Sequence, residues 1–263
     1  MTFDHDRTVA IQRANLATEV LMIAGAAPGS SLYDGGGILA AVVPSAPEQT
    51  IVNMATFDTV AGLIAGLDGM TDAYRSAGVR KWSIWVPGWE TDAMAALTTR
   101  GYRNTLRLPA ILLDLATFEP CDLSDLEHDA DADMATVGRI NEAAHDGGAG
   151  LAAALQNMPP GLDLRPYRAR LDGEAAAVVC AIDNPGVDGA ADCGVYFGAT
   201  HPDAAGKRLG RKLLTAALLD ARERGCATAS GQASLVGAPI WTALGFDTAF
   251  MFDTFTWTEA DRV

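Results

Sequence analysis

Apolar residues recur with a helical period near the end of the chain. The clearest stretch is LLTAALLDARER at 213–224, where apolar positions 213, 214, 217, 218 and 221 form one stripe along a helix. Gly225 follows where glycine commonly ends a helix, and Arg222 and Arg224 put positive charge in the last turn, where the helix dipole favours it. The pattern predicts a helix that ends at Gly225.

Other apolar segments are short and bounded by turn residues, which is typical of strands. They include residues 175–182, 192–200 and 250–257. The segment NPGVDG at 184–189 has the chemistry of a turn and predicts that the first two strands form an antiparallel hairpin. Helical and strand-like segments alternate, so the pattern predicts an α/β fold with a mixed sheet.

The two halves of the chain share one order of features. The first half has DAYRSAG, a strand KWSIWV, a helix, LTTRGY and a strand RLPAILLDL. The second half has DARERG, a strand-like ATASGQAS, a short helix, ALGF and a strand AFMFDTFTW. A shared order of this kind predicts an internal duplication.

An acidic segment separates the two halves. Residues 119–133 contain seven acidic side chains and no basic one, and Pro120 opens the run. A self-repelling stretch of this kind is typical of a junction between domains. We therefore expect one domain at 1–118 and a second at 119–263.

Composition and charge narrow the classes of function. The 263 residues include 33 acidic and 19 basic ones, which gives a formal charge of −14, and 49% are hydrophobic. This composition predicts a folded chain, and the negative field would repel nucleic acid and anionic bilayers. The sequence has no apolar run long enough to span a membrane, and its beginning is acidic where a signal peptide would be basic. We therefore expect a cytoplasmic protein.

The cysteines do not indicate disulfides or a metal site. Four cysteines without CxxC spacing are too few for a disulfide framework, and zinc is not expected. We interpret Cys180 and Cys226 as small buried apolar residues. Cys193 has no evident His and Asp partners in the sequence, which argues against a nucleophile.

Residues 201–212 combine a strand end, glycines and positive charge. Pro202 restricts His201 to an extended conformation, so we expect a strand to end there. Positive charge at the start of a helix has the wrong sign for the helix dipole, which predicts a bound anion such as a phosphate. The alternative is a solvated helix face. Four cations follow or flank the glycines Gly206 and Gly210: Lys207, Arg208, Arg211 and Lys212.

Residues 194–246 resemble the cofactor-binding core of the GNAT superfamily of acyl-CoA-dependent N-acyltransferases. The loop AGKRLG at 205–210, the helix RKLLTAALLDARERG at 211–225 and the ending PIWTALGF at 239–246 carry the resemblance. It implies two GNAT-like halves, each with a mixed, mostly antiparallel sheet flanked by helices. The first half lacks the loop and is therefore degenerate. The resemblance is clear over 120–258 and weaker over 1–115.

The resemblance also implies roles for particular residues. It implies that backbone groups of Gly198, Ala199 and Thr200 bind the pantetheine arm of acetyl-CoA, and that an amide near Ala199 binds the oxyanion. Tyr196 is a candidate for proton transfer, with a core aromatic as the alternative. The expected pyrophosphate loop comprises Ala205, Gly206, Lys207, Arg208, Leu209 and Gly210, and the remaining cofactor contacts are Ser234 and Trp241.

Five positions depart from the family pattern, and the first is Ala205, where the loop usually begins with Arg or Gln. Arg208 stands where the loop usually has a glycine, so its guanidinium is a candidate for a phosphate contact. Trp241 stands where many members have a tyrosine that acts as the general acid for the leaving thiolate. An indole cannot serve as an acid near neutral pH. Ser234 stands where the family often has an asparagine and keeps hydrogen-bonding capacity, so it is also a candidate for a catalytic role. The strand position that often carries a glutamate base is Gly194.

These observations predict an acetyltransferase that acts on an amine of a small molecule or peptide. The acidic balance favours a cationic acceptor. His145 is either a substrate-facing residue or a surface histidine. The alternatives are an acyl-CoA-binding or scaffolding protein that has lost catalysis, which Trp241 favours, and a structural dimerisation module. The oligomeric state stays open, with a homodimer as one option.

Overall fold

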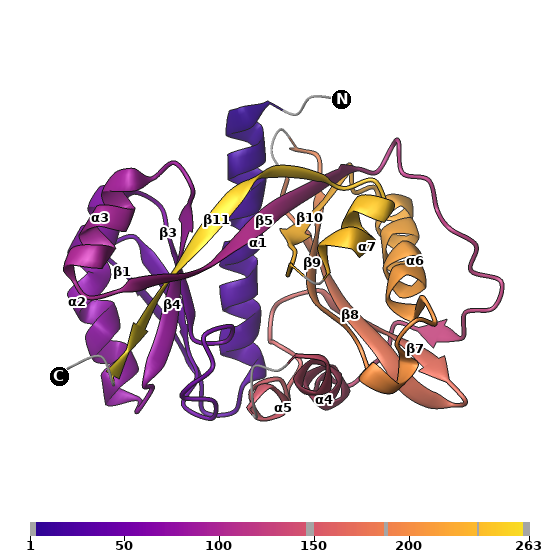
Figure 1. Ribbon diagram of the computed structural model, residues 1–263, viewed down its shortest axis with the longest axis horizontal. Helices are drawn as coiled ribbons and strands as arrows, with labels where there is room; N and C mark the ends of the chain where they lie inside the picture. The colour runs from indigo at the N-terminus through magenta and orange to yellow at the C-terminus, as the bar shows by residue number, and fades with distance from the viewer. Residues whose placement is uncertain (1–3, 146–149, 187–188, 236, 260–263) are drawn as a thin grey trace.

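The computed structural model describes residues 4–145, 150–186, 189–235 and 237–259. It contains one sheet of eleven strands with helices packed on both faces (Figure 1). The first elements are α1 (His5–Ala26), β1 (Ser31–Gly35), β2 (Ile38–Val42), β3 (Met54–Phe57), α2 (Val60–Ser76), β4 (Lys81–Pro87), α3 (Thr91–Thr99) and β5 (Arg103–Asp114). They are followed by β6 (His128–Asp129), α4 (Met134–Ala144), α5 (Leu151–Ala154), β7 (Leu164–Leu171), β8 (Glu174–Asn184), β9 (Asp192–Thr200), the 3₁₀ turn Pro202–Ala204, α6 (Leu209–Glu223), β10 (Thr228–Gln232), α7 (Ala238–Ala243) and β11 (Asp247–Thr258).

The expected mixed, mostly antiparallel sheet is confirmed. Its strand order is β1-β2-β3-β4-β11-β5-β10-β9-β8-β7-β6, and the parallel pairs are β3 with β4 and β10 with β9. The predicted hairpin is also present, since β8 and β9 pair antiparallel. Part of its turn, residues 187–188, lies outside the described residues.

The last strand of each half lies beside strands of the other half. β11, from the end of the chain, pairs with β4 on one side and β5 on the other, while β5 also pairs with β10. Figure 1 shows β5 and β11 crossing the centre of the molecule together. The sheet therefore continues from one half into the other, and neither half has a free edge at the junction.

The register at the centre of the sheet has local two-fold symmetry. Leu108 of β5 lies opposite Phe252 of β11. The two are 144 positions apart, as are Gly101 and Gly245, which precede the same strands. This regularity supports the duplication that the shared order of features predicts. We propose that residues 1–118 and 119–263 descend from one repeated unit that exchanged its last strand.

Helix α1 fastens the two halves through buried polar side chains. Gln12 Nε2 donates to the carbonyl of Ile111 at 2.7 Å, and Asn15 Nδ2 donates to the carbonyl of Ser230 at 3.1 Å. Thr18 Oγ1 donates to Asn184 Oδ1 at 2.6 Å. Because buried polar groups are costly without partners, these bonds fix both the position and the rotation of α1 on the sheet.

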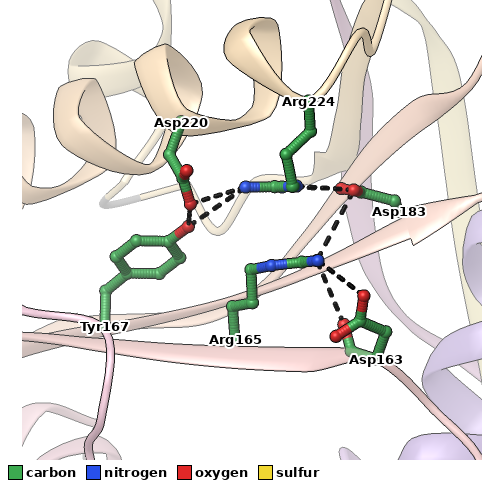
Figure 2. A network of polar contacts seen from close by, with 6 residues as sticks. All are labelled: Asp163, Arg165, Tyr167, Asp183, Asp220 and Arg224. Carbon is green, nitrogen blue, oxygen red and sulfur yellow. Dashed lines mark hydrogen bonds and ion pairs between the residues drawn. The ribbon is translucent and has the colours of Figure 1, made fainter.

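Helix α6 agrees with the predicted apolar stripe. The five stripe residues are buried against the sheet, and Gly225 follows with a left-handed φ of 93°. At this end of the helix the Arg224 guanidinium donates to both Asp183 carboxylate oxygens, and Nη1 donates to Asp220 (Figure 2). The network holds the carboxyl end of α6 on β8. The five stripe residues are Leu213, Leu214, Ala217, Leu218 and Ala221.

The acidic segment runs outside α6 before it enters α4. Asp125 pairs with Lys212, and Arg222 Nη1 donates to the carbonyl of Phe118 at 3.3 Å. Asp133 then caps α4, because its carboxylate accepts from Thr136 N at 2.7 Å. None of the helices in the described part of the chain has the length and apolar character that crossing a bilayer requires.

Candidate active site

Strands β9 and β10 begin as a parallel pair and then separate. Their register pairs run from Asp192 with Thr228 to Gly194 with Ser230, while β9 continues to Thr200. A cavity of about 350 Å³ lies beside the end of β9. Its walls include β8, the end of β9, the first turn of α6 and the region of α7.

A β-bulge lies in β9 beside this cavity. The register passes from Cys180 opposite Tyr196 to Val178 opposite Ala199, so Phe197 and Gly198 have no register partner on β8 or β10. Phe197 has a left-handed φ of 49°, and its carbonyl accepts from Asn141 Nδ2 at 2.9 Å. A bulge redirects backbone groups. Here it presents the backbone at Gly198 and Ala199 to the cavity.

The first cavity brings together many of the residues expected to bind a cofactor. Gly210 approaches the end of β9 closely, since a Cβ on this residue would lie 2.7 Å from Thr200 Oγ1. The first turn of α6 therefore packs directly against the strand end, and a larger residue at this position would require Thr200 or the helix to shift. The expected residues on the wall are Gly198, Ala199, Thr200, Gly210, Ser234 and Trp241.

The expected phosphate loop leads into the amino end of α6. Ala205, Gly206, Lys207 and Arg208 are exposed, while Leu209 is buried and can offer only its backbone to a ligand. Arg208 is the N-cap residue of α6 and has a left-handed φ of 60°. This conformation costs a residue with a side chain about 1–2 kcal/mol relative to glycine, which the family pattern places here.

The four cations near the start of α6 differ in their interactions within the chain. Lys212 forms an ion pair with Asp125, and Arg211 Nη2 donates to the carbonyl of Ala243 at 3.2 Å. The side chains of Lys207 and Arg208 have no hydrogen-bond or ion-pair partner within the described ranges. Two of the four cations are thus paired within the chain, and the two with unpaired side chains lie at the helix start.

A second cavity of about 430 Å³ adjoins the first. Its wall includes Glu19 from α1, Trp85 from β4, Leu108 from β5 and Tyr196 from β9. The two cavities meet at the bulge. Five residues line both of them: His145, Gly198, Ser234, Gly237 and Trp241.

Trp241 and Ser234 lie at this meeting point. Trp241 is half-buried and packs edge-on against Phe246, with ring centroids 4.9 Å apart. Ser234 is exposed, and its Oγ accepts from Gly237 N at 3.0 Å while retaining its own proton for donation. His145 also contributes to both walls, so the structure places it at the cavities as the substrate-facing alternative predicts.

Tyr196 is held in a buried hydrogen-bond network. Its hydroxyl donates to the carbonyl of Asn15 at 3.2 Å and accepts from Asn184 Nδ2 at 3.2 Å. Burial raises the pKa of Tyr196 well above its usual range. A Cβ at Gly194 would lie 2.2 Å from the Tyr196 hydroxyl oxygen, so this strand position cannot carry a carboxylate. The placement favours the core-aromatic alternative for Tyr196.

Cys193 is fully buried, and burial raises the pKa of its thiol well above the usual range. A buried, protonated thiol is a poor nucleophile. Cys180 and Cys226 are buried, as predicted. Among the described residues, no group of three or more His, Cys, Asp or Glu side chains is arranged to hold a metal ion.

Glu19 is the functional candidate that the sequence analysis missed. Its side chain is buried in the wall of the second cavity, and burial raises the pKa of its carboxyl from 4.5 to about 8. Across residues 4–145, 150–186, 189–235 and 237–259 its carboxylate has no hydrogen-bond or ion-pair partner. The helical spacing of Gln12, Asn15 and Glu19 puts three polar side chains on one face, and this signal is visible in the sequence.

The comparisons with known proteins agree with this geometry. The model of the acetyltransferase (GNAT) family matches residues 142–237, which include the bulge, the loop and α6. Residues 142–237 are a GNAT domain. Members of this family generally transfer an acyl group from an acyl-CoA to an amine.

Solved structures show the same fold over nearly the whole chain. A GCN5-related N-acetyltransferase from Kribbella flavida has a TM-score of 0.62 and 16% identity, covering 93% of this chain and 95% of that one. A tandem GNAT protein from the clavulanic acid biosynthesis pathway has a TM-score of 0.58 and 13% identity, covering 95% of each chain. A GCN5-related N-acetyltransferase from Sphaerobacter thermophilus has a TM-score of 0.58 and 12% identity, covering 85% and 77%. No curated protein matches the sequence.

Proposed function

We propose that this protein transfers an acetyl group from acetyl-CoA to an amine of a small molecule or peptide. The observation that carries the proposal is the meeting of two cavities at the β9 bulge. One cavity is lined by Gly210 in the first turn of α6, which Lys207 and Arg208 precede in the chain, and the other is lined by residues of both halves. The acetyl donor follows the description of the family that matches the GNAT domain.

The first cavity accounts for the binding of the donor. Lys207, Arg208 and the free N–H groups at the start of α6 offer positive charge and hydrogen bonds to a pyrophosphate. The separated edge of β9 offers backbone groups to the pantetheine arm, and apolar walls from Val178, Val179 and Leu214 exclude water from it. The thioester would then lie at the bulge.

The bulge supplies the electrostatic part of the reaction. Attack of a neutral amine on the thioester carbonyl forms a C–N bond and puts negative charge on the carbonyl oxygen. We expect backbone N–H groups at Gly198 and Ala199, which line the first cavity at the bulge, to stabilise that charge. The nitrogen loses one proton to solvent and the C–S bond breaks. The thiolate leaves and takes up a proton from solvent, because Trp241 cannot donate one.

Turnover and binding measurements test the proposal together. Acetyl-CoA is expected to bind the protein by calorimetry and to release free thiol when a panel of primary amines is added. No binding would contradict the proposal. Binding without thiol release on any amine would select the second candidate, an acyl-CoA-binding or scaffolding protein, which the indole at position 241 favours.

A further inference from the structure

The second cavity contains a buried carboxylate, that of Glu19, which has no partner among the described residues. Glu19 lies on α1 one helical turn after Asn15, whose carbonyl accepts from the Tyr196 hydroxyl at 3.2 Å. Residues four apart lie on the same face of a helix, so Glu19 is docked next to Tyr196 and the bulge that follows it. Burial raises the pKa of Tyr196, and the nearby charge of Glu19 raises it further, which agrees with this placement.

The absence of a partner for Glu19 distinguishes it from the other buried acid of this region. Asp192 is also buried, but its carboxylate accepts from Thr228 Oγ1 at 2.7 Å and from Ser230 Oγ at 2.5 Å. No such donor reaches Glu19 within the part of the chain that the structure describes. A buried carboxylate without a partner lowers stability. A cationic ligand in the second cavity would supply the missing partner.

The rest of the second cavity fits the apolar body of such a ligand. Leu106, Leu108, Ile51 and Trp85 contribute to its wall, and its volume of about 430 Å³ is within the range of small-molecule sites. Trp85 is 8% exposed, and within the described residues its indole N–H has no hydrogen-bond partner. The cavity therefore has an unpaired acceptor and an unpaired donor along apolar walls.

We propose that Glu19 is the general base of the reaction and that the second cavity binds a small primary amine with an apolar body. This inference rests on the proposed acetyltransferase function. The carboxylate pairs with the ammonium group of the acceptor and removes one proton, which gives a neutral amine and a protonated Glu19. The amine attacks the thioester, the C–N bond forms and the C–S bond breaks. The second amine proton is lost to solvent, the thiolate takes up a proton, and Glu19 returns its proton to solvent.

The protonation equilibrium of Glu19 suits this role. A primary ammonium group has a pKa of about 10.4, and burial raises the pKa of Glu19 from 4.5 to about 8. The two values are then close enough for proton transfer to be accessible, as general base catalysis requires. The other titratable groups that line the cavity are Glu48, Lys81, His145 and Tyr196.

The test compares the wild-type protein with Glu19→Gln and with a matched control, Glu90→Gln. Glu90 forms an ion pair at 3.3 Å with Arg13 of α1, the helix that also carries Glu19, and Glu90 lines neither cavity. The probes are acetyl-CoA with benzylamine, phenethylamine and isoamylamine, and separately with a lysine-containing peptide. Circular dichroism and acetyl-CoA affinity establish that each variant is folded and binds the donor.

The expected result is a loss confined to the amine step. Wild-type kcat/KM rises with pH through about 8, where the base loses its proton. Glu19→Gln lowers kcat/KM by about 100-fold or more and removes this limb of the pH profile. Its acetyl-CoA affinity is unchanged, and Glu90→Gln resembles the wild type in every measurement.

Each contrary outcome has its own meaning. If the wild type does not bind acetyl-CoA, the proposed function itself fails. If the wild type acetylates an amine but Glu19→Gln keeps the same pH profile, the base assignment is wrong. If the donor binds and no amine is acetylated, the proposed function and the base assignment both fail. Acetylation of the peptide in preference to every small amine would overturn the small-amine assignment.

Discussion

The guanidinium of Arg224 holds both carboxylate oxygens of Asp183, at 2.6 and 2.7 Å, and so ties α6 to β8 (Figure 2). Asp183→Asn is expected to lower the free energy of unfolding by about 1–3 kcal/mol, because charge-assisted bonds to a mostly buried guanidinium are lost. Urea unfolding at neutral pH measures the change. The control is Asp163→Asn. The side chain of Asp163 is 77% exposed and forms an ion pair with Arg165. An equal loss in the two variants would contradict the assignment.

The interaction between Asp183 and Arg224 makes the stability of the fold depend on pH. Burial alone would raise the pKa of Asp183, but the hydrogen bonds and charge of Arg224 outweigh it and lower the pKa. The stabilisation is therefore full above the pKa of an unfolded aspartate, about 3.9, and is lost as pH falls through the lower folded value. We expect the stability difference between wild type and Asp183→Asn to shrink below about pH 4. A difference that persists in strong acid would exclude this linkage.

The pH dependence of stability that Glu19 causes has the opposite sign. Its carboxyl is more easily protonated in the folded state, with a pKa of about 8 against 4.5 for the ordinary group, so the fold loses stability as pH rises between these values. Glu19→Gln should therefore be more stable than the wild type above about pH 8, by roughly 1–4 kcal/mol, and equal to it below about pH 4.5. Thermal unfolding across this range measures the difference. A constant difference would show that Glu19 does not titrate as proposed.

Local patterns in the sequence predicted the elements around the donor cavity. The stripe at 213–224 and the turn residues at 184–189 gave α6 and the β8–β9 hairpin, because both depend on neighbours within one element or turn. The placement of β5 and β11 could not be predicted in this way. Leu108 and Phe252 become neighbours only through pairing across 144 positions, and periodicity carries no information about such a partner.

The acceptor side was hidden for a related reason. The buried face of α1 carries Gln12, Asn15 and Glu19, so the helix lacks the apolar stripe by which sequence analysis finds a core helix. Gln12 and Asn15 are buried because backbone carbonyls of Ile111 and Ser230 accept from them. Those acceptors are visible only in the folded chain. The ion pair between Asp125 and Lys212 likewise cannot be predicted from the sequence.

Arg208 allows strain and phosphate binding to be separated. Arg208→Gly removes the guanidinium and suits the φ of 60°, so it should raise the free energy of unfolding by about 1 kcal/mol. Arg208→Ala removes the same charge but keeps the strained conformation. Both variants are expected to weaken acetyl-CoA binding by about tenfold, the effect of one charge-assisted contact. Calorimetry at low and high salt checks this, and unchanged affinity in both variants would exclude a phosphate contact.

Gly210 sets the distance between α6 and the end of β9. A Cβ there would lie 2.7 Å from Thr200 Oγ1, so Gly210→Ala should push the first turn of α6 away from the strand. We expect a loss of about 1–3 kcal/mol in the free energy of unfolding and weaker acetyl-CoA binding, since overpacking displaces backbone. Thr200→Ala removes the clashing oxygen and should restore much of the stability when combined with Gly210→Ala. A double-mutant cycle of unfolding free energies measures this coupling. Strictly additive effects would show that the close approach of Gly210 and Thr200 does not limit the position of the helix.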